Sequence, residues 1–226
     1  MRRAVLSIPV SLQSEPLTSA ALGERTDRLA DITARAAVVV LFSLMTMRFA
    51  ADFLATGRIT GLLLLLSELL VVVMTVRRRS AAAMDRSVRA RLLTLASMLG
   101  PPLLSPALVA AVAPGAVTVV FSVAGLMLVI AGKLTLGRSF GLIPANRGVV
   151  SSGPYRLVRH PIYMGYLVTH LAFLAANPSG WNIAIVLVAD TALLARAVCE
   201  EGVLAEDPSY RVYQALVRWR VCPGLF

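Results

Sequence analysis

The stretch GPYRLVRHPIYMG, residues 153–165, is a dense polar cluster in a chain that is 58% hydrophobic. It opens on the turn pair Gly153-Pro154 and holds two arginines, a histidine and two tyrosines. The residue before a proline is biased towards extended geometry, so we expect His160 to lie outside a helix that begins at Pro161. The free N–H groups at that helix start, with Arg159 beside them, predict a site for a carboxylate or phosphate.

The same stretch has two interpretations, a binding site and a membrane edge. Tyr155 and Tyr163 carry flat faces that can stack on a ring or lie against a cation, and Gly165 permits close approach to the backbone. Equally, the arginines suit lipid phosphates and the tyrosines suit the aromatic belt of a membrane edge. From these residues alone, a binding site and a cytosolic membrane edge remain open.

The composition indicates an integral membrane protein. Charged residues make up only 15% of the 226, and runs such as Gly61–Val76 and Val117–Ile130 are too apolar for a soluble domain of this length. The net charge of +10 comes almost entirely from arginine. We interpret it as a sign of membrane topology and of contact with lipids, and we expect no nucleic-acid partner. With two cysteines and two histidines, we predict neither a disulfide framework nor a metal site.

The predicted fold is an all-α polytopic bundle in three regions. Residues 1–34 are predicted to form a cytosolic tail, although Arg2-Arg3 and the short apolar run after them faintly resemble a signal peptide. Residues 35–134 hold four spans, and 135–226 hold a cofactor loop, a helical hairpin and a C-terminal helix. The six predicted spans are Ala36–Ala55, Ile59–Val76, Leu92–Ala113, Ala116–Leu134, Pro161–Ala176 and Trp181–Cys199. Pro101-Pro102 and Pro106 predict a kink or break in the third.

Arginines are distributed unevenly among the predicted loops. Six lie between spans two and three, and four lie with Lys133 between spans four and five, whereas the joins 113–115 and 177–180 carry no charge. Since positive residues stay in the cytosol, we expect both termini and residues 153–165 to be cytosolic. Asp207-Pro208 has the form of a helix cap and first turn, and predicts an interfacial helix over Ser209–Arg220 on the cytosolic surface.

Spans five and six are predicted to form an antiparallel hairpin, so the start of one lies near the end of the other. This places Arg159, His160 and Tyr163 close to Arg196, Glu200 and Glu201. Arg196 and Glu200 are four residues apart and share a helix face. A simple ion pair at a helix end explains them, but so does a polar cosubstrate, because a carboxylate suits ribose hydroxyls or an ammonium.

Two ionisable residues lie deeper in the same hairpin. His170 is nine residues after Pro161 and Asp190 is ten before Glu200. Both are therefore roughly 14–15 Å from the cytosolic edge at a rise of about 1.5 Å per residue. Because such groups need an inward partner, we predict that His170 and Asp190 face each other or share one water. The alternative is that each bonds separately to another span.

GPYRLVRHPIYMG, followed by RAVCEE at 196–201 and YRVYQALVRWRVCPGLF at 210–226, resembles the isoprenylcysteine carboxyl methyltransferase family, and most closely its short bacterial members. The resemblance covers roughly Leu136–Phe226, with LGRSFGLIPANRGVVSSGPY as the lead-in. It implies a membrane-embedded methyltransferase that uses S-adenosylmethionine without a Rossmann domain, and the Gly-rich Rossmann fingerprint is indeed absent from the sequence.

The resemblance also implies roles for individual residues. The implied cosubstrate contacts are Gly148, Val149, Val150, Tyr155, His160, Pro161, Ile162, Tyr163 and Glu200. Arg196 is implied to bind the acceptor, and we expect Arg196, Glu200 and Arg159 to be the catalytic residues. Eukaryotic members have a histidine where this chain has Arg147, which leaves a contact at 147 open.

The acceptor decides whether a base is needed. A carboxylate, held by Arg196 with its lipid tail in the membrane, needs none, whereas an amine or thiol would need Glu201 or Tyr163. We therefore expect a lipophilic or prenylated acceptor and contact with membrane lipids, with phospholipid N-methylation and thiol S-methylation as variants. An NADPH-dependent reductase of the sterol-reductase type, with Arg147, Arg156 and Arg159 on the phosphate, and a non-enzymatic scaffold are the alternatives. The oligomeric state stays open.

Overall fold

The computed structural model describes residues 32–33, 35–47, 50–51, 53–55, 59–79, 81, 83–85, 87–105 and 109–226. The chain divides into two units, Met1–Val38 and Val39–Phe226. In the first unit, residues 32–33 and 35–38 are helical. Most of the predicted tail 1–34, and Pro106 in the predicted third span, lie outside the described residues.

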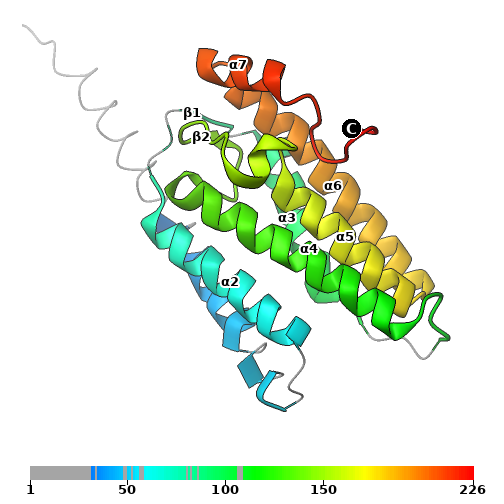
Figure 1. Cartoon of the computed structure of the whole chain (residues 1–226). Coiled ribbons are helices and arrows are strands. Elements are labelled where there is room, and N and C mark those ends of the chain that lie inside the picture. Colours follow the sequence, from blue (N-terminus) through cyan, green and yellow to red (C-terminus); the bar gives the residue numbers. More distant parts are fainter. Residues whose placement is uncertain are drawn as a thin grey trace, which may run out of the picture. The chain divides into compact units, whose positions relative to one another are not determined.

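The second unit is built from helices, as the sequence predicts (Figure 1). The helices are α2 (Ile59–Arg77), α3 (Val88–Leu99), α4 (Gly115–Leu136), α5 (Pro161–Ala176), α6 (Gly180–Leu204) and α7 (Pro208–Leu216), with 3₁₀ turns at Pro101–Leu103, Gly137–Ser139 and Gly153–Arg156. Residues 39–47, 50–51 and 53–55, which belong to the first predicted span, are also helical. The sheet in the described part of the chain is one antiparallel pair of two-residue strands, β1 (Ala83–Met84) and β2 (Ala145–Asn146).

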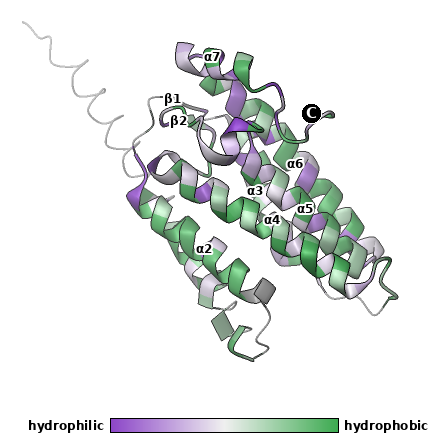
Figure 2. Ribbon diagram, viewed as in Figure 1, coloured by the Kyte–Doolittle hydropathy of each residue, from purple (hydrophilic) through white to green (hydrophobic). Residues whose placement is uncertain are grey.

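Among the described residues, two helices are long and apolar enough to cross a membrane. They are Gly115–Ser139, which is α4 with the turn after it, and Gly180–Leu204, which is α6. The helix α5 is apolar but shorter, and it begins at Pro161 and ends at Ala176 as predicted. Figure 2 shows hydrophobic residues along α2, α4 and α6, with hydrophilic residues gathered around β1, β2 and α7.

The predicted third span, Leu92–Ala113, is not a continuous helix. The helix α3 stops just before Pro101-Pro102, because prolines supply no N–H groups to continue the helical hydrogen bonds. The described residues 104–105 and 109–114 that follow are not helical. Instead, Asn182 at the start of α6 accepts the Ser105 N–H at 3.2 Å and donates to the Ser105 carbonyl at 2.9 Å. The predicted break is confirmed, and the predicted helix beyond it is wrong.

Glycines bring α4 and α5 into close contact. A Cβ atom on Gly165 would lie 2.6 Å from the carbonyl oxygen of Gly125, and one on Gly132 would lie 2.7 Å from Cγ1 of Ile162. Real Cβ atoms do not approach so closely, and small residues at helix crossings allow backbones to pack directly. This packing holds the first two turns of α5 against the second half of α4.

The connecting loops gather at two ends of the unit. At one end the Arg79 N–H donates to the Arg138 carbonyl at 2.9 Å, and β1 pairs with β2, so the two arginine-rich loops are joined. At the other end the Val112 N–H donates to the Ala175 carbonyl at 2.8 Å, next to the two uncharged joins. Positive charge is therefore concentrated at one end of α4, α5 and α6.

The C-terminal helix is shorter than the predicted Ser209–Arg220, because α7 ends at Leu216. Beyond it, the carbonyl of Trp219 accepts the Arg159 N–H at 2.9 Å and the carbonyl of Arg220 accepts the His160 N–H at 2.7 Å. The backbone after α7 thus bonds to the loop before α5, and this competes with continuation of the helix. The predicted extent to Arg220 is wrong, and His160 lies outside α5 as predicted.

Candidate functional site

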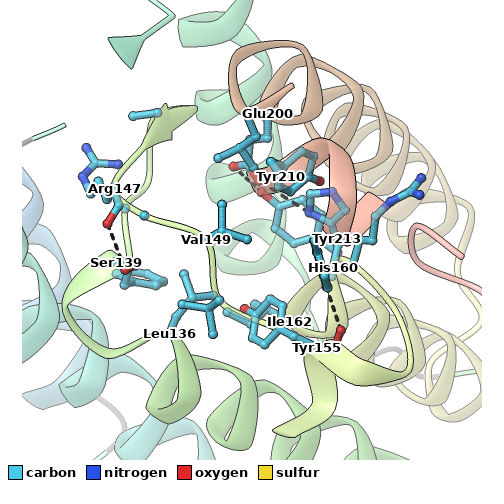
Figure 3. Close-up of a pocket in the computed structure, with 18 of the residues that line it drawn as sticks. Leu136, Ser139, Arg147, Val149, Tyr155, His160, Ile162, Glu200, Tyr210 and Tyr213 are labelled. Carbon is cyan, nitrogen blue, oxygen red and sulfur yellow. Dashed lines mark hydrogen bonds and ion pairs between the residues drawn. The ribbon is translucent and has the colours of Figure 1, made fainter. Parts of the chain in front are cut away.

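A cavity of about 120 Å³ opens between the end of α4, the loop 139–150, the start of α5, the end of α6 and α7 (Figure 3). Since a single water molecule needs roughly 10–15 Å³ of such space, the cavity has room for a much larger group. Predicted site residues that line it are Gly148, Val149, Val150, Tyr155, Arg159, His160, Ile162, Tyr163, Arg196 and Glu200. Pro161 is fully buried and is not among the lining residues.

The segment that carries Gly148 is shaped by side chains from three elements. The Ser139 hydroxyl donates to the Arg147 carbonyl at 3.0 Å, and Oδ1 of Asn146 accepts the Gly148 N–H at 3.0 Å. Gly148 has φ of 99°, in the left-handed region that favours glycine. The Asn146 amide also donates to Asp207, the cap of α7, at 3.1 Å. The loop and α7 are therefore positioned together.

Glu200 lies at the meeting point of α5 and α6. Its Oε1 accepts the Tyr163 hydroxyl at 2.6 Å and Nε and Nη2 of Arg196 at 3.1 and 3.0 Å. Its Oε2 lies 3.6 Å from Nδ1 of His160. The predicted shared face of Arg196 and Glu200 is confirmed, as is their proximity to the start of α5. Charge-assisted bonds of this kind are among the stronger hydrogen bonds in proteins.

The neighbouring acid, Glu201, binds the C-terminal segment. Its Oε1 accepts Nε of Arg159 at 2.8 Å and lies 3.3 Å from Nε2 of His160. Its Oε2 accepts Nε of Arg220 at 2.8 Å and the Gln214 amide at 3.4 Å. The side chain is only 5% exposed. A carboxylate whose oxygens are both engaged in this way is poorly suited to accept a proton from a substrate.

Arg159 is bound by protein groups on both sides of its fork. Besides Glu201, its Nη1 donates to the carbonyl of Val217 at 3.1 Å. The side chain is 8% exposed, yet the residue forms part of the cavity wall. Its charge is therefore balanced inside the protein, and it connects the cavity to the segment after α7.

Sequence reasoning missed the aromatic wall that α7 contributes. Tyr210 and Tyr213 line the cavity, and they pack with Tyr155 and Val217 in one buried cluster. The Tyr213 hydroxyl donates to the Tyr155 carbonyl at 2.7 Å. The available signal was the spacing of residues 210, 213 and 217, which places them on a different face from the exposed Val212 and Leu216.

These phenols stay protonated at physiological pH. Burial raises the pKa of Tyr213 to about 12, against the opposing effect of the Arg159 charge. Burial, with the nearby Glu200 charge, also raises the pKa of Tyr155 well above its ordinary value. Neither side chain supplies a phenolate base to the cavity.

The site coincides with a known family domain. Residues 115–206 match the Isoprenylcysteine carboxyl methyltransferase (ICMT) family, which confirms the predicted resemblance over that part of the chain. No curated protein matches the chain. The matched residues include α4, α5, α6 and the loop that carries Gly148, whereas α7 lies beyond them. This match over residues 115–206 supports a membrane methyltransferase.

Proposed function

We propose that this protein is an S-adenosylmethionine-dependent methyltransferase embedded in the membrane, acting on the carboxylate of a lipophilic, isoprenylcysteine-like acceptor. The observation that carries this proposal is the cluster of Arg196, Glu200 and Tyr163, which lines the same cavity as the Gly148 segment. The family domain supports the reaction class. The cluster places the cation of Arg196 beside the carboxylate of Glu200. The cation suits the carboxylate of the acceptor, and the carboxylate suits the ammonium or the ribose of the cosubstrate.

The cavity lining fits S-adenosylmethionine in its chemistry. An apolar part suits the purine ring, and it consists of Leu136, Phe140, Ile143, Val149, Ile162 and Leu204. Glu200 suits the ammonium or the ribose hydroxyls, and Gly148 allows close approach to the backbone. When bound, S-adenosylmethionine would supply a methyl group on a sulfonium: an O–C bond to the acceptor would form as the C–S bond breaks, with its electron pair left on the departing sulfur.

The cavity residues favour an acceptor that needs no base. Both oxygens of Glu201 already have donors, and Tyr163 donates its own proton to Glu200. A carboxylate is ionised at neutral pH, so methylation of it releases no proton, unlike methylation of an ammonium or a thiol. Arg196 donates to Glu200 through Nε and Nη2 and lies over the Tyr163 ring, so donation to an acceptor carboxylate falls to its remaining N–H groups. Amine and thiol acceptors are therefore the weaker variants.

The helix surfaces support a membrane setting with a cytosolic cavity. Large apolar side chains are more than half exposed on α4, α5 and α6, among them Val120 at 64%, Leu171 at 62% and Leu187 at 63%. Surfaces of this kind are unfavourable in water and favourable in lipid. The arginine-rich loops lie at the cavity end of these helices, which matches a cytosolic orientation. The bilayer would then hold the lipophilic part of the acceptor.

The reductase alternative is less well supported by the same residues. It needs cations for the extra phosphate of NADPH, but Arg156 is not among the lining residues of the cavity. Arg159 lines it but is bound to Glu201. This leaves Arg147 as the remaining candidate of the three, and a single arginine is a weak phosphate site.

Calorimetric titration of the purified protein in detergent with S-adenosylhomocysteine and with NADPH tests the proposal. We expect saturable binding of S-adenosylhomocysteine and none of NADPH. Binding of NADPH alone would favour the reductase, and binding of neither would favour a scaffold without an active site. Glu200→Gln is the matched control, since it changes one charged group in the cavity without changing its size.

A further inference from the structure

Tyr210 presents a hydroxyl group that the protein does not satisfy. The residue is 3% exposed and lines the cavity from α7. Its hydroxyl oxygen is buried and has no hydrogen-bond partner among the described residues. Buried hydroxyls usually have a partner, because one without a partner has lost its bonds to water and gained nothing in exchange. This orphan group lies in the wall of the candidate site.

Tyr213 shows that the cavity wall can satisfy such a hydroxyl. It lies one turn further along α7, is also buried, and donates to the Tyr155 carbonyl at 2.7 Å. The rings of Tyr210 and Tyr213 meet edge to face, with centroids 5.6 Å apart and planes at 61°. The two tyrosines share a helix, a face and a cluster, so packing of α7 does not by itself account for the difference between their hydroxyls.

The surroundings make Tyr210 a donor. Tyr210 lines the same cavity as Glu200 and is close enough to feel its charge (Figure 3). Burial, with the charges of Glu201 and Glu200, raises the pKa of Tyr210 above its ordinary value, and Arg159 only partly opposes them. The hydroxyl therefore keeps its proton at neutral pH and needs an acceptor atom.

We propose that the Tyr210 hydroxyl donates a hydrogen bond to an oxygen of bound S-adenosylmethionine, which makes α7 part of the cosubstrate site. This inference rests on the proposed function. Glu200 suits the ammonium or the ribose of the cosubstrate, so the oxygens within reach of its neighbour Tyr210 belong to the amino-acid carboxylate or the ribose. Because the hydroxyl is shielded in the ligand-free protein, the bond forms as the wall adjusts around the ligand.

Two matched variants on α7 separate this role from simple packing. Tyr210→Phe removes only the orphan hydroxyl, so we expect the melting temperature of the ligand-free protein to stay the same or rise. Binding of S-adenosylhomocysteine, measured by calorimetry in detergent, should weaken roughly 3- to 10-fold if the oxygen belongs to the ribose, which is the range for one lost neutral hydrogen bond, and by more if it belongs to the carboxylate. Tyr213→Phe removes a satisfied hydroxyl and should lower the ligand-free melting temperature.

A second probe identifies the oxygen. 5′-Methylthioadenosine keeps the ribose and lacks the amino acid, so weaker binding of both probes to Tyr210→Phe assigns the bond to the ribose. Weaker binding of S-adenosylhomocysteine alone assigns it to the carboxylate. Unchanged affinity for both probes, or a ligand-free melting temperature lowered as in Tyr213→Phe, overturns the inference and leaves the proposed function standing. If the wild-type protein binds neither probe, both this inference and the proposed function are overturned.

Discussion

Nδ1 of His170 lies 2.6 Å from Oδ1 of Asp190, and this contact joins α5 to α6 deeper in the hairpin than the cavity. The side chains are 8% and 15% exposed, so the pair is largely hidden from its surroundings. The ring of Tyr166 stacks on His170, with centroids 6.2 Å apart. The predicted pairing at matching depth is confirmed. Because α5 and α6 carry the two halves of the candidate site, this contact holds those halves together.

Asp190→Asn tests whether the pair is structural. The amide keeps the shape but loses the charge, so we expect a loss of about 1.5–3 kcal/mol in the free energy of unfolding, typical of a hydrogen bond to a charged group. The affinity of the folded fraction for S-adenosylhomocysteine should stay nearly intact. Thermal melts and calorimetry measure the two quantities, with Val188→Ala, at a 62% exposed position on the same helix, as control. An unchanged melting temperature would contradict a structural pair.

Glu200→Gln should weaken binding of S-adenosylhomocysteine by about tenfold or more, because the amide loses the charge that makes its hydrogen bonds strong. Stability should change less than affinity, since Tyr163 and Arg196 can still donate to the amide oxygen. Calorimetry on the purified variant measures the affinity. If it matches that of the wild type, Glu200 is not a ligand of the cosubstrate.

Glu201→Gln is the contrasting variant at the next position. Both oxygens of Glu201 accept hydrogen bonds, so the amide nitrogen of glutamine would face a donor such as Arg159 or Arg220, and the buried Arg159 would lose its charged partner. We therefore expect this variant to reduce stability strongly, by about 3–5 kcal/mol as for other broken buried pairs. Thermal melts of the two variants side by side should show the larger loss for Glu201→Gln. The reverse order would mean that the structural and ligand-binding roles of the two acids are exchanged.

The contacts that the sequence predicted depend on spacing within a helix or on depth in one hairpin. The pairing of Arg196 with Glu200 follows from four-residue spacing, and the start of α5 follows from Pro161. The contact of His170 with Asp190 follows from matching depth in two antiparallel helices. Each of these needs only the local geometry of elements that the hydrophobic runs already define.

The contacts that the sequence did not predict depend on how the residues after α7 fold back against the loop before α5. The pattern of apolar residues continues past Leu216, so periodicity alone extends α7 to Arg220. It gives no sign that the carbonyls of Trp219 and Arg220 receive N–H groups from the loop before α5. For the same reason Arg159 was expected to bind an anionic ligand, whereas its fork lies on Glu201 and the Val217 carbonyl.

Arg196→Ala should mainly impair use of the acceptor. Removing one partner of a buried charged contact typically costs about 2 kcal/mol or more, so kcat/KM for a prenylcysteine analogue should fall roughly 30-fold or more. Affinity for S-adenosylhomocysteine should fall less than in Glu200→Gln. Arg196→Lys is the matched control, since it keeps the charge and loses the fork. Equal loss of cosubstrate affinity in Arg196→Ala and Glu200→Gln would contradict separate roles.

The orientation of α6 can be tested at its two ends. A Cβ atom on Gly180 or on Gly202 meets nothing within 4 Å, so both positions should accept cysteine. In a background with Cys199 and Cys222 replaced by alanine, a membrane-impermeant thiol reagent should label Gly202→Cys from the cytosolic side and Gly180→Cys only from the opposite side. Labelling of both from the cytosolic side would refute a spanning α6.

The most direct test of the proposed reaction is transfer of a labelled methyl group from S-adenosylmethionine to a prenylcysteine analogue and to a lipid extract, in membranes that contain the protein. A carboxyl methyl ester is cleaved by base, so the product should release its label as methanol on alkaline treatment. We predict base-labile label on the prenylcysteine analogue with the wild-type protein, and little with Glu200→Gln or Arg196→Ala. Absence of transfer from the wild-type protein, or label that stays on an amine or sulfur atom after base treatment, would contradict carboxyl methylation.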